Sequence, residues 1–411
     1  MTNSLSHFVP PPFFVETNEE AIQNMGNIHS KLHTNVRTNK SYVILNYDKN
    51  MVCDDDLTRG VYNSVIVNPQ NREIMAIGPS KPRSFQSFCE QYSLPQDISD
   101  LYVNELIEGT QIQLFFDPQT DGWEIATRNA VGGNYIFYRE PNKISPTFLQ
   151  MVMDAFQESP DADLNSISFL SRFERNCCYH FVLQHPSNRL VQNILRAKMY
   201  LIGVHQMRED GVQFIPPTEY ELWDFGTNVI HFPKNYTNSI IYRENQNVYQ
   251  EYVDTFASIQ CSPTQYMGVV FTNVKSGDRS IVINPQYESM QVMRGNSPNI
   301  QYHYLCLKKT NKEKEFLHHF PFFKKMFSEF HREFERLVQH IHQSYFIHYI
   351  QKSNETISPK YYGHIKQIHE NIYIPSLLSQ KVIVRKEVVR NYLLDLSPAS
   401  ILHIWNYHIR E

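Results

Sequence analysis

The sequence lacks the features that mark disulfide-rich, zinc-ribbon and membrane proteins. Its six cysteines are scattered without a CxxC spacing, which indicates reduced thiols rather than a disulfide framework or a zinc ribbon. No run approaches the ~20 apolar residues of a membrane span. The first residues have neither the basic nor the apolar segment of a signal peptide. We therefore expect a cytoplasmic protein with no membrane partner.

An excess of charge of one sign is also missing, because 38 Lys and Arg stand against 42 Asp and Glu, a formal net charge of −4. This balance excludes a globally basic nucleic-acid-binding protein, so any basic surface must be local. The chain is rich instead in apolar residues (41%) and aromatic residues (13%) over 411 positions. Such a composition predicts a folded globular protein of two or three domains.

The pattern along the chain predicts three parts. Residues 1–40 are polar and contain three consecutive prolines, which is typical of a flexible N-terminal arm. Residues 41–310 contain short runs of β-type residues bounded by turn residues, with helical stretches near 148–156 and 249–260. This mixture predicts an α+β domain built on antiparallel sheets.

Residues 311–411 have a helical pattern. Apolar residues recur at steps of three and four from Phe323 to Tyr345, which predicts a long amphipathic helix with Pro321 in its first turn. Shorter helices are expected at 361–369 and 386–394, and Ser397 with Pro398 opens a last one. We expect a C-terminal helical domain here.

The segment Glu105-Leu-Ile-Glu-Gly-Thr110 has the form of a nucleophile motif without its nucleophile. Covalent nucleotidyltransferases place a lysine two residues before an acidic-glycine pair, and its amine attacks the α-phosphate of a nucleotide. That position is Leu106, whose side chain has no lone pair. Covalent catalysis by this route is therefore excluded.

Four further segments accompany this motif in order. They are Thr58-Arg-Gly60 with Pro79 to Phe85, Trp123 to Gly133, Phe181 to Val191 with Tyr200 to Val204, and Gln265 to Asn296. Together the five segments resemble the phage-type RNA ligases that repair tRNA, and more closely the RNA-ligase-like proteins of large DNA viruses. The resemblance implies a nucleotidyltransferase domain of antiparallel sheets, similar to that of RNA and DNA ligases and ATP-grasp-like in type.

The departures from the family pattern all remove charge. The resemblance puts catalytic lysines and glutamates at five positions that are apolar in this chain: Leu106, Val182, Met267, Ile281 and Ile283. In active relatives the cations neutralise the transferring phosphoryl group and the acids hold Mg²⁺. A cleft lined by apolar side chains would bind a triphosphate and its metal only at a large desolvation penalty.

Several polar positions of the pattern remain. As candidate nucleotide or RNA contacts we take Arg59, Lys81, Arg83, Glu108, Gly109, Arg128, Arg189 and Arg294. Arg189 is more simply a residue that ties a turn, and the glycines are equally consistent with ordinary strand-turn geometry. Nucleic-acid contact through so few cations would be weak and sensitive to salt.

Two other groups of residues favour plain structural roles. The histidines of the C-terminal part, such as His340 and His348, have no carboxylate or cysteine to complete a metal site, so no metal is expected. The run from Lys381 to Arg390 is modestly basic, and a solvated face is the default interpretation, although it could touch RNA or an acidic protein.

These observations favour a protein that is not an enzyme. The resemblance implies a catalytically inactive RNA-ligase-like protein of a large DNA virus, located in the host cytoplasm or the virus particle, that binds other viral proteins and needs no cofactor. Two alternatives remain open. One is an ATP-dependent RNA ligase that uses ATP and Mg²⁺ with a lysine from elsewhere, such as Lys81. The other is a nucleic-acid-binding module that uses the old cleft.

Overall fold

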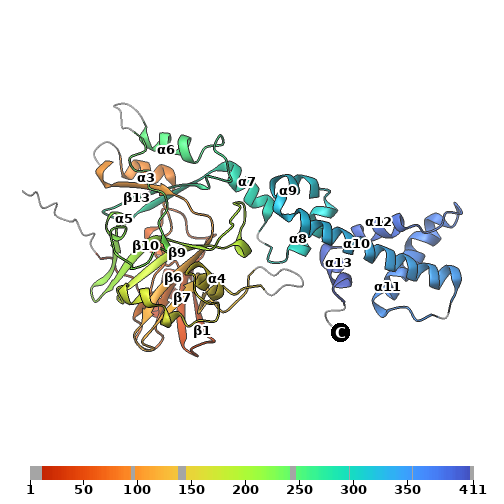
Figure 1. The fold of residues 1–411 in the computed structure, drawn as a ribbon, viewed down its shortest axis with the longest axis horizontal. Coiled ribbons are helices and arrows are strands. Elements are labelled where there is room, and N and C mark those ends of the chain that lie inside the picture. Colours follow the sequence, from red (N-terminus) through yellow and green to blue (C-terminus); the bar gives the residue numbers. More distant parts are fainter. Residues whose placement is uncertain are drawn as a thin grey trace, which may run out of the picture. The chain divides into compact units, whose positions relative to one another are not determined.

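The computed structural model describes residues 12–93, 98–137, 145–240, 247–295, 297–353 and 355–407. Within them the chain divides into two compact units, each described by itself below (Figure 1). The sheet unit contains the described residues up to 137 and those from 145 to 291. The helical unit contains the described residues from Val292 onward. No helix in the described residues is long and apolar enough to cross a membrane.

Three β-sheets form the framework of the sheet unit. The strands of the four-stranded sheet follow in the order β1 (Ile28–Thr34), β2 (Ser41–Tyr47), β3 (Val65–Val67) and β4 (Ile74–Ala76). The three-stranded sheet has the order β14 (Arg279–Ile283), β13 (Gly268–Asn273) and β5 (Leu101–Glu105). The seven-stranded sheet has the order β11 (Gly211–Ile215), β10 (Lys198–Arg208), β9 (Cys177–Gln184), β6 (Thr110–Asp117), β7 (Gly122–Thr127) and β8 (Ala130–Val131), with β12 (Ile230–His231) beside β10.

All strand pairs in these sheets are antiparallel except β10 with β12. The helices of this unit are α1 (Glu19–Met25), α2 (Leu57–Gly60), α3 (Phe85–Gln91), α4 (Phe148–Ala155), α5 (Pro217–Tyr220) and α6 (Val248–Phe256), and α7 (Pro285–Arg294) crosses the division between the units. Short 3-10 turns are η1 (Ile98–Asp100), η2 (Leu164–Ser166), η3 (Ser168–Arg172) and η4 (Pro186–Asn188). This architecture confirms the predicted α+β class.

The sequence of β2 shows why the four-stranded sheet has two buried faces. Val43 and Leu45 pack into one apolar cluster with Ile22 of α1. Tyr42 and Ile44 point the other way and pack against Phe115 of β6. An almost continuous apolar run is expected for a strand covered on both sides, in contrast to the alternation of a half-exposed strand.

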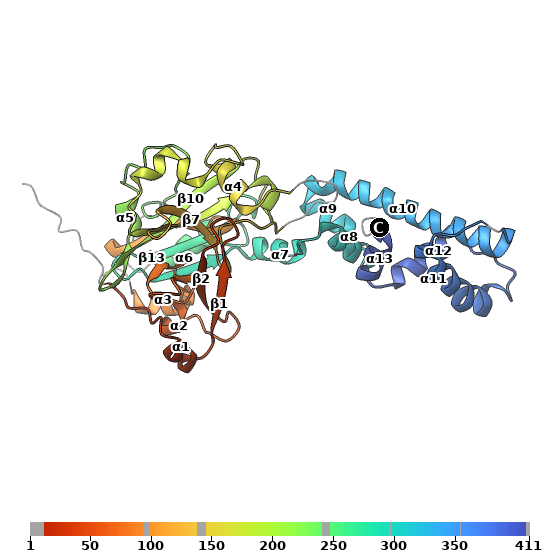
Figure 2. The same cartoon turned by 90° about the horizontal axis from the view of Figure 1, so that it is seen from below.

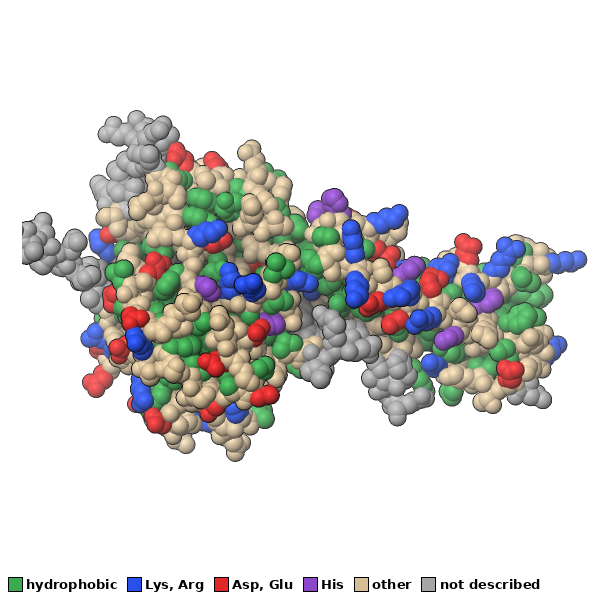
Figure 3. Space-filling model, viewed as in Figure 1, with side chains coloured by type: hydrophobic (Ala, Val, Ile, Leu, Met, Phe, Trp, Pro, Cys, Tyr) green, Lys and Arg blue, Asp and Glu red, His purple; other side chains and the backbone are tan. Residues whose placement is uncertain are grey.

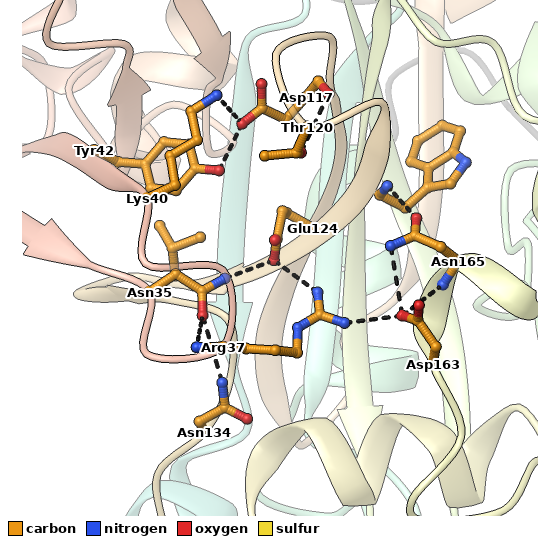
Figure 4. Close-up of polar contacts among 12 residues, drawn as sticks. Asn35, Arg37, Lys40, Tyr42, Asp117, Thr120, Glu124, Asn134, Asp163 and Asn165 are labelled. Atoms are coloured by element: carbon orange, nitrogen blue, oxygen red, sulfur yellow. Dashed lines mark hydrogen bonds and ion pairs between the residues drawn. The ribbon is translucent and has the colours of Figure 1, made fainter.

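Buried charges fasten the β1–β2 hairpin to the seven-stranded sheet. The Lys40 ammonium and the Tyr42 hydroxyl both contact the Asp117 carboxylate at the end of β6, and Tyr42 donates over 2.7 Å (Figure 4). Asp117 is fully buried. Burial and the Asp117 carboxylate raise the pKa of Tyr42 far above its usual value, so the phenol stays protonated and donates.

A second buried contact lies beside the first. Asn35 donates to the Glu124 carboxylate over 2.9 Å, and Arg37 donates to the same carboxylate over 3.2 Å and to Asp163 over 3.0 Å (Figure 4). Burial raises the pKa of Glu124, while the Arg37 charge opposes this shift. The structure therefore differs from the expected flexible arm: residues 19–40 form α1, β1 and this buried connection, and residues 1–11 lie outside the described part.

The helical unit is built around α10 (Lys324–Tyr345), which packs with α8, α11 and α12 (Figure 2). Its buried residues Phe327, Phe334 and Ile341 lie on the face predicted from the three-and-four spacing, so the long helix is confirmed. The remaining elements are α8 (Ile300–Lys309), α9 (Glu313–His319), η5 (Pro321–Phe323), η6 (Phe346–Gln351), α11 (Pro359–Ile368), η7 (His369–Leu377), α12 (Lys386–Asp395) and α13 (Pro398–Trp405). Because α8 packs against α13, the compact unit begins at Val292 rather than at residue 311.

Candidate functional site

The site predicted from the sequence lies on one face of the three-stranded sheet. Val103, Val269 and Phe271 point to the other face, where they pack against Phe88 of α3 and Tyr249 of α6. Because side chains alternate along a strand, residues 279, 281 and 283 of β14 and residues 268 and 270 of β13 point to the predicted face.

Four of the five positions at which the sequence resemblance predicted charged residues lie together on this sheet. Gly268 pairs with Ile283, and the Leu106 amide donates to the Gly268 carbonyl over 3.1 Å. Met267 directly precedes Gly268, and its carbonyl accepts from the Asn284 amide. Ile281 is two residues along β14 from Ile283. The structure brings these four positions together as an apolar, part-buried set.

The fifth position, Val182, comes from β9 of the seven-stranded sheet. Its neighbours Phe181 and Leu183 belong to the main apolar core, so Val182 points to the opposite face. A Cβ atom placed on Gly109 would lie 2.6 Å from Cγ1 of Val182 and 2.4 Å from the Leu183 carbonyl oxygen. Gly109 is therefore required by close packing of the 106–109 loop on β9, which is a structural reason for glycine at this position.

Glu108 is fully buried, and its carboxylate is occupied by the protein itself. It accepts hydrogen bonds from the amides of Leu190 (2.7 Å), Val191 (3.1 and 3.2 Å) and Gln192 (2.9 Å), and from the Tyr287 hydroxyl (2.8 Å). Consecutive amides that converge on one carboxylate form an anion-binding nest. Glu108 therefore holds the 190–192 turn and α7 against the 106–109 loop, rather than facing a nucleotide.

Arg59 and Arg128 are likewise held by neighbouring groups. Arg59 donates to the Met25 carbonyl over 2.9 and 3.0 Å and to Asp56 over 2.7 Å. Arg128 donates to Asn63 over 2.8 Å and to the Tyr47 carbonyl over 2.9 Å, with its guanidinium 4.7 Å from the centre of the Tyr47 ring. Arg59 thus ties α2 to the end of α1, and Arg128 ties the turn between β7 and β8 to β2 and to the loop before β3.

Lys81 and Arg83 line a cavity, but each has an acidic partner. The Lys81 ammonium lies 3.0 Å from Asp54 and donates to the Val52 carbonyl over 2.5 Å. Arg83 lies 2.7 Å from Asp278, and its backbone amide donates to the Arg279 carbonyl. These residues are at the Arg279 end of β14, about 13 Å along the strand from Ile283. The structure does not bring Lys81 to the Leu106 end.

The last two candidate cations lie elsewhere. Arg189 follows the η4 turn, and its guanidinium contacts Asn193 over 3.4 Å. Arg294 is 4% exposed within the helical unit, with its guanidinium 5.1 Å from the centre of the Phe323 ring. Arg294 is thus packed in the interior of the helical unit, and the sequence pattern gave no sign of that burial.

Two lysines near the Leu106 end were not identified from the sequence. Burial raises the pKa of Glu105, the neighbour of Leu106, and the charges of Lys234 and Lys198 oppose that shift. Lys198 lies on β10, two residues from Tyr200, which pairs with Val182. The Glu105 amide bonds to the Lys234 carbonyl over 2.9 Å. Since neither lysine stands in a Lys-x-acid-Gly motif, only their positions in space reveal them.

The described residues contain no group of three or more histidine, cysteine or acidic side chains placed to hold a metal ion. His340 contacts the Tyr361 hydroxyl over 3.3 Å, and His348 packs edge-on against Tyr349. Both histidines therefore have ordinary contacts within the helical unit.

No protein-family model and no curated protein matches the sequence. The solved structures that the chain resembles include Naegleria gruberi RNA ligase with PPi, at 13% identity and a TM-score of 0.36, over 52% of this chain and 57% of that chain. An apo mutant of a Naegleria gruberi RNA ligase matches at 12% identity and a TM-score of 0.37, over 68% of this chain and 84% of that chain. A putative ATP-dependent DNA ligase from Aquifex aeolicus matches at 13% identity and a TM-score of 0.39, over 73% of this chain and 68% of that chain. The chain spans little more than half of the first of these, and its structural neighbours are RNA ligases and an ATP-dependent DNA ligase at low identity.

Proposed function

We propose that the protein is a catalytically inactive, RNA-ligase-like nucleotidyltransferase that acts as a binding or structural component of a large DNA virus. One observation carries the proposal: Leu106, Met267, Ile281 and Ile283, where the family resemblance puts charged residues, are apolar and lie together on the three-stranded sheet. Transfer of a nucleotidyl group needs an amine at the α-phosphate and cations around it. The motifs described from the sequence support the viral origin, and other viral proteins are the proposed partners.

The state of the neighbouring acid supports the same proposal. Both carboxylate oxygens of Glu108 accept hydrogen bonds from the protein. A carboxylate engaged in this way would have to break several bonds before it could bind Mg²⁺. We therefore propose that no cofactor is needed, and ATP with Mg²⁺ belongs to the alternative of an active ligase.

Incubation with radiolabelled ATP or GTP and Mg²⁺ or Mn²⁺, followed by denaturing electrophoresis, tests this proposal. We expect no covalent band from the natural sequence. The Leu106→Lys variant should also label at least about a hundredfold less than an active ligase run in parallel, because Ile281 and Ile283 supply no cation at the two positions where the family pattern has its phosphate-binding lysines. A labelled band from the natural protein that disappears in Lys198→Ala or Lys81→Ala would establish an active ligase instead.

Nucleic-acid binding is a second candidate function, and the distribution of charge favours it. Residues 292–411 contain 17 Lys and Arg against 10 Asp and Glu, a net charge of +7, whereas residues 1–291 contain 21 against 32, a net charge of −11. Figure 3 shows many Lys and Arg side chains on the visible face of the helical unit. On α10 the exposed cations are Lys324, Lys325, Arg332 and Arg336. Binding would then use the helical unit rather than the old cleft.

Removal of the four exposed α10 cations by alanine substitution should weaken binding to single-stranded RNA about tenfold or more at low salt. Each lost phosphate contact should also reduce the slope of log K against log salt by about 0.7. Fluorescence anisotropy over a salt series measures both quantities. Four alanine substitutions on the sheet unit provide the matched control, namely Arg72, Arg172, Arg175 and Arg208. Equal loss in both variants would argue against an interface on α10.

A further inference from the structure

A cavity of about 470 Å³ lies in the sheet unit at the end of β14 that is remote from Leu106. Its wall includes three cations (Lys81, Arg83 and Arg279) and two acids (Glu16 and Asp278). Ligand-binding cavities commonly have volumes of roughly 300–1,000 Å³ and combine an apolar wall with a few polar groups. The cavity is thus large enough for a small organic molecule.

Arg279 differs from the other two cations because its charge is not neutralised. Its Nη2 donates to the Ser80 carbonyl over 3.0 Å, and no carboxylate lies within ion-pair distance of it among the described residues. The nearby Asp278 carboxylate is engaged by Arg83 and by the Tyr92 hydroxyl (2.6 Å). Burial lowers the pKa of Arg279 to about 10, so the guanidinium remains charged at neutral pH.

An uncompensated, desolvated cation is unfavourable unless an anion balances it. The two histidines nearest to Arg279 do not supply one. Burial lowers the pKa of His205 to about 3 and also lowers that of His180 well below its usual value, and the Arg279 charge adds to both shifts. Both imidazoles are therefore neutral at physiological pH. Of the two acids in the cavity wall, Asp278 is engaged by Arg83 and Glu16 accepts from the Asn18 amide, so an external anion would be the counter-charge.

Aromatic rings also line the cavity. His205 packs between Phe13, at 6.1 Å and nearly perpendicular, and Phe214, at 5.9 Å. Phe14 also lines the cavity and is 76% exposed. A ligand anchored at Arg279 would thus meet rings that can pack against an apolar or planar body.

We propose that this cavity binds a small phosphate monoester, with the phosphate on the Arg279 guanidinium and an aromatic or apolar body against Phe13 and Phe214. The planar guanidinium suits two oxygens of a phosphate at once. Lys81 and Arg83 also line the cavity, but each is paired with an acid, so Arg279 supplies the charge that would bind the phosphate. The site is separate from the Leu106 end, so it does not depend on whether that end retains catalysis.

Calorimetric titration of the full chain with phenyl phosphate, AMP and inorganic phosphate tests the proposal. We expect Arg279→Met to weaken binding of all three at least about tenfold. Phe214→Ala should weaken binding of the two monoesters and leave the affinity for inorganic phosphate nearly unchanged. Phenol and adenosine, which have the bodies without the phosphate, should not bind. Comparison of AMP with phenyl phosphate shows whether a nucleotide or another aromatic phosphate fits the body of the site.

Thermal denaturation separates binding from folding. Without ligand, Arg279→Met should melt at the same temperature as the natural protein or higher, because it removes an unbalanced cation, but phosphate monoesters should no longer raise its melting temperature. Arg279→Lys and Arg279→Gln serve if the methionine variant does not fold. Arg172→Met, at a surface arginine paired with Asp224, is the matched control. No binding of any phosphate, or equal binding by the Arg279 variants, would overturn the proposal.

Discussion

Replacement of Glu108 by alanine should lower the free energy of unfolding of the sheet unit by about 4 kcal/mol. The substitution leaves three backbone amides without an acceptor, one buried (Val191) and two part-buried, and each unsatisfied buried group costs about 1–3 kcal/mol. Glu108→Gln should have a smaller effect, since one amide oxygen can still accept. Tyr287→Phe removes one donor and should cost about 1 kcal/mol.

Denaturant unfolding followed by tryptophan fluorescence measures this loss. In a Trp405→Phe background the remaining tryptophans, Trp123 and Trp223, both report on the sheet unit. Glu158→Ala, at an exposed acid, should change stability by less than about 0.5 kcal/mol. If Glu108→Ala were as mild as this control, the hydrogen bonds to Glu108 would not be the main link between the 106–109 loop and the 190–192 turn.

Acidification should lower the free energy of unfolding of the sheet unit already at pH values above those at which ordinary carboxylates become protonated. Burial lowers the pKa of His205 to about 3 and lowers that of His180 well below 6.5, whereas both titrate near 6.5 when unfolded. Below pH 6.5 the unfolded chain therefore binds more protons than the folded chain. Stability is fully present above about pH 6.5 and should fall by roughly 5 kcal/mol for the pair by about pH 4.5.

Unfolding in denaturant at a series of pH values, again in the Trp405→Phe background, measures the slope. Double replacement of His180 and His205 by glutamine should flatten the dependence of the free energy of unfolding on pH between 6.5 and 4.5. This holds even if the replacements lower stability at all pH values. Burial raises the pKa values of Glu105, Glu124 and Glu221, so their contribution has the opposite sign: it favours the folded state as pH falls through their range. A curve of equal steepness in the double variant would assign the acid sensitivity to other groups.

The parts of the fold that depend on local pattern were predictable. The three-and-four spacing from Phe323 to Tyr345 has the same period as the helix it forms, and the polar Ser397 before Pro398 caps α13 as expected. Ile281 lies two residues from Ile283 on β14, and the Leu106 amide bonds to Gly268, which pairs with Ile283, so these three positions lie close together.

The roles of the charged residues were not predictable, because their partners are distant in sequence. Glu108 meets the amides of residues 190–192 and the hydroxyl of Tyr287, and Arg83 meets Asp278. No spacing rule connects such positions in a single sequence. The same applies to Asn35 and Arg37, whose contacts with Glu124 make the N-terminal region part of the sheet unit. Arg279 lies within the segment Gln265 to Asn296, but nothing in that segment indicates that it faces a cavity without a counter-ion.

The buried connection between the β1–β2 hairpin and the seven-stranded sheet has a consequence for the behaviour of the protein in concentrated salt. Mobile ions weaken attraction between charges at the surface, but they have little access to Asp117 and Glu124, which are 0% and 1% exposed. The hairpin should therefore stay attached at ionic strengths that disrupt the surface ion pair between Arg72 and Glu19. Its release is then coupled to cooperative opening of the whole sheet, so the hairpin should not detach by itself as an unpaired pair of strands.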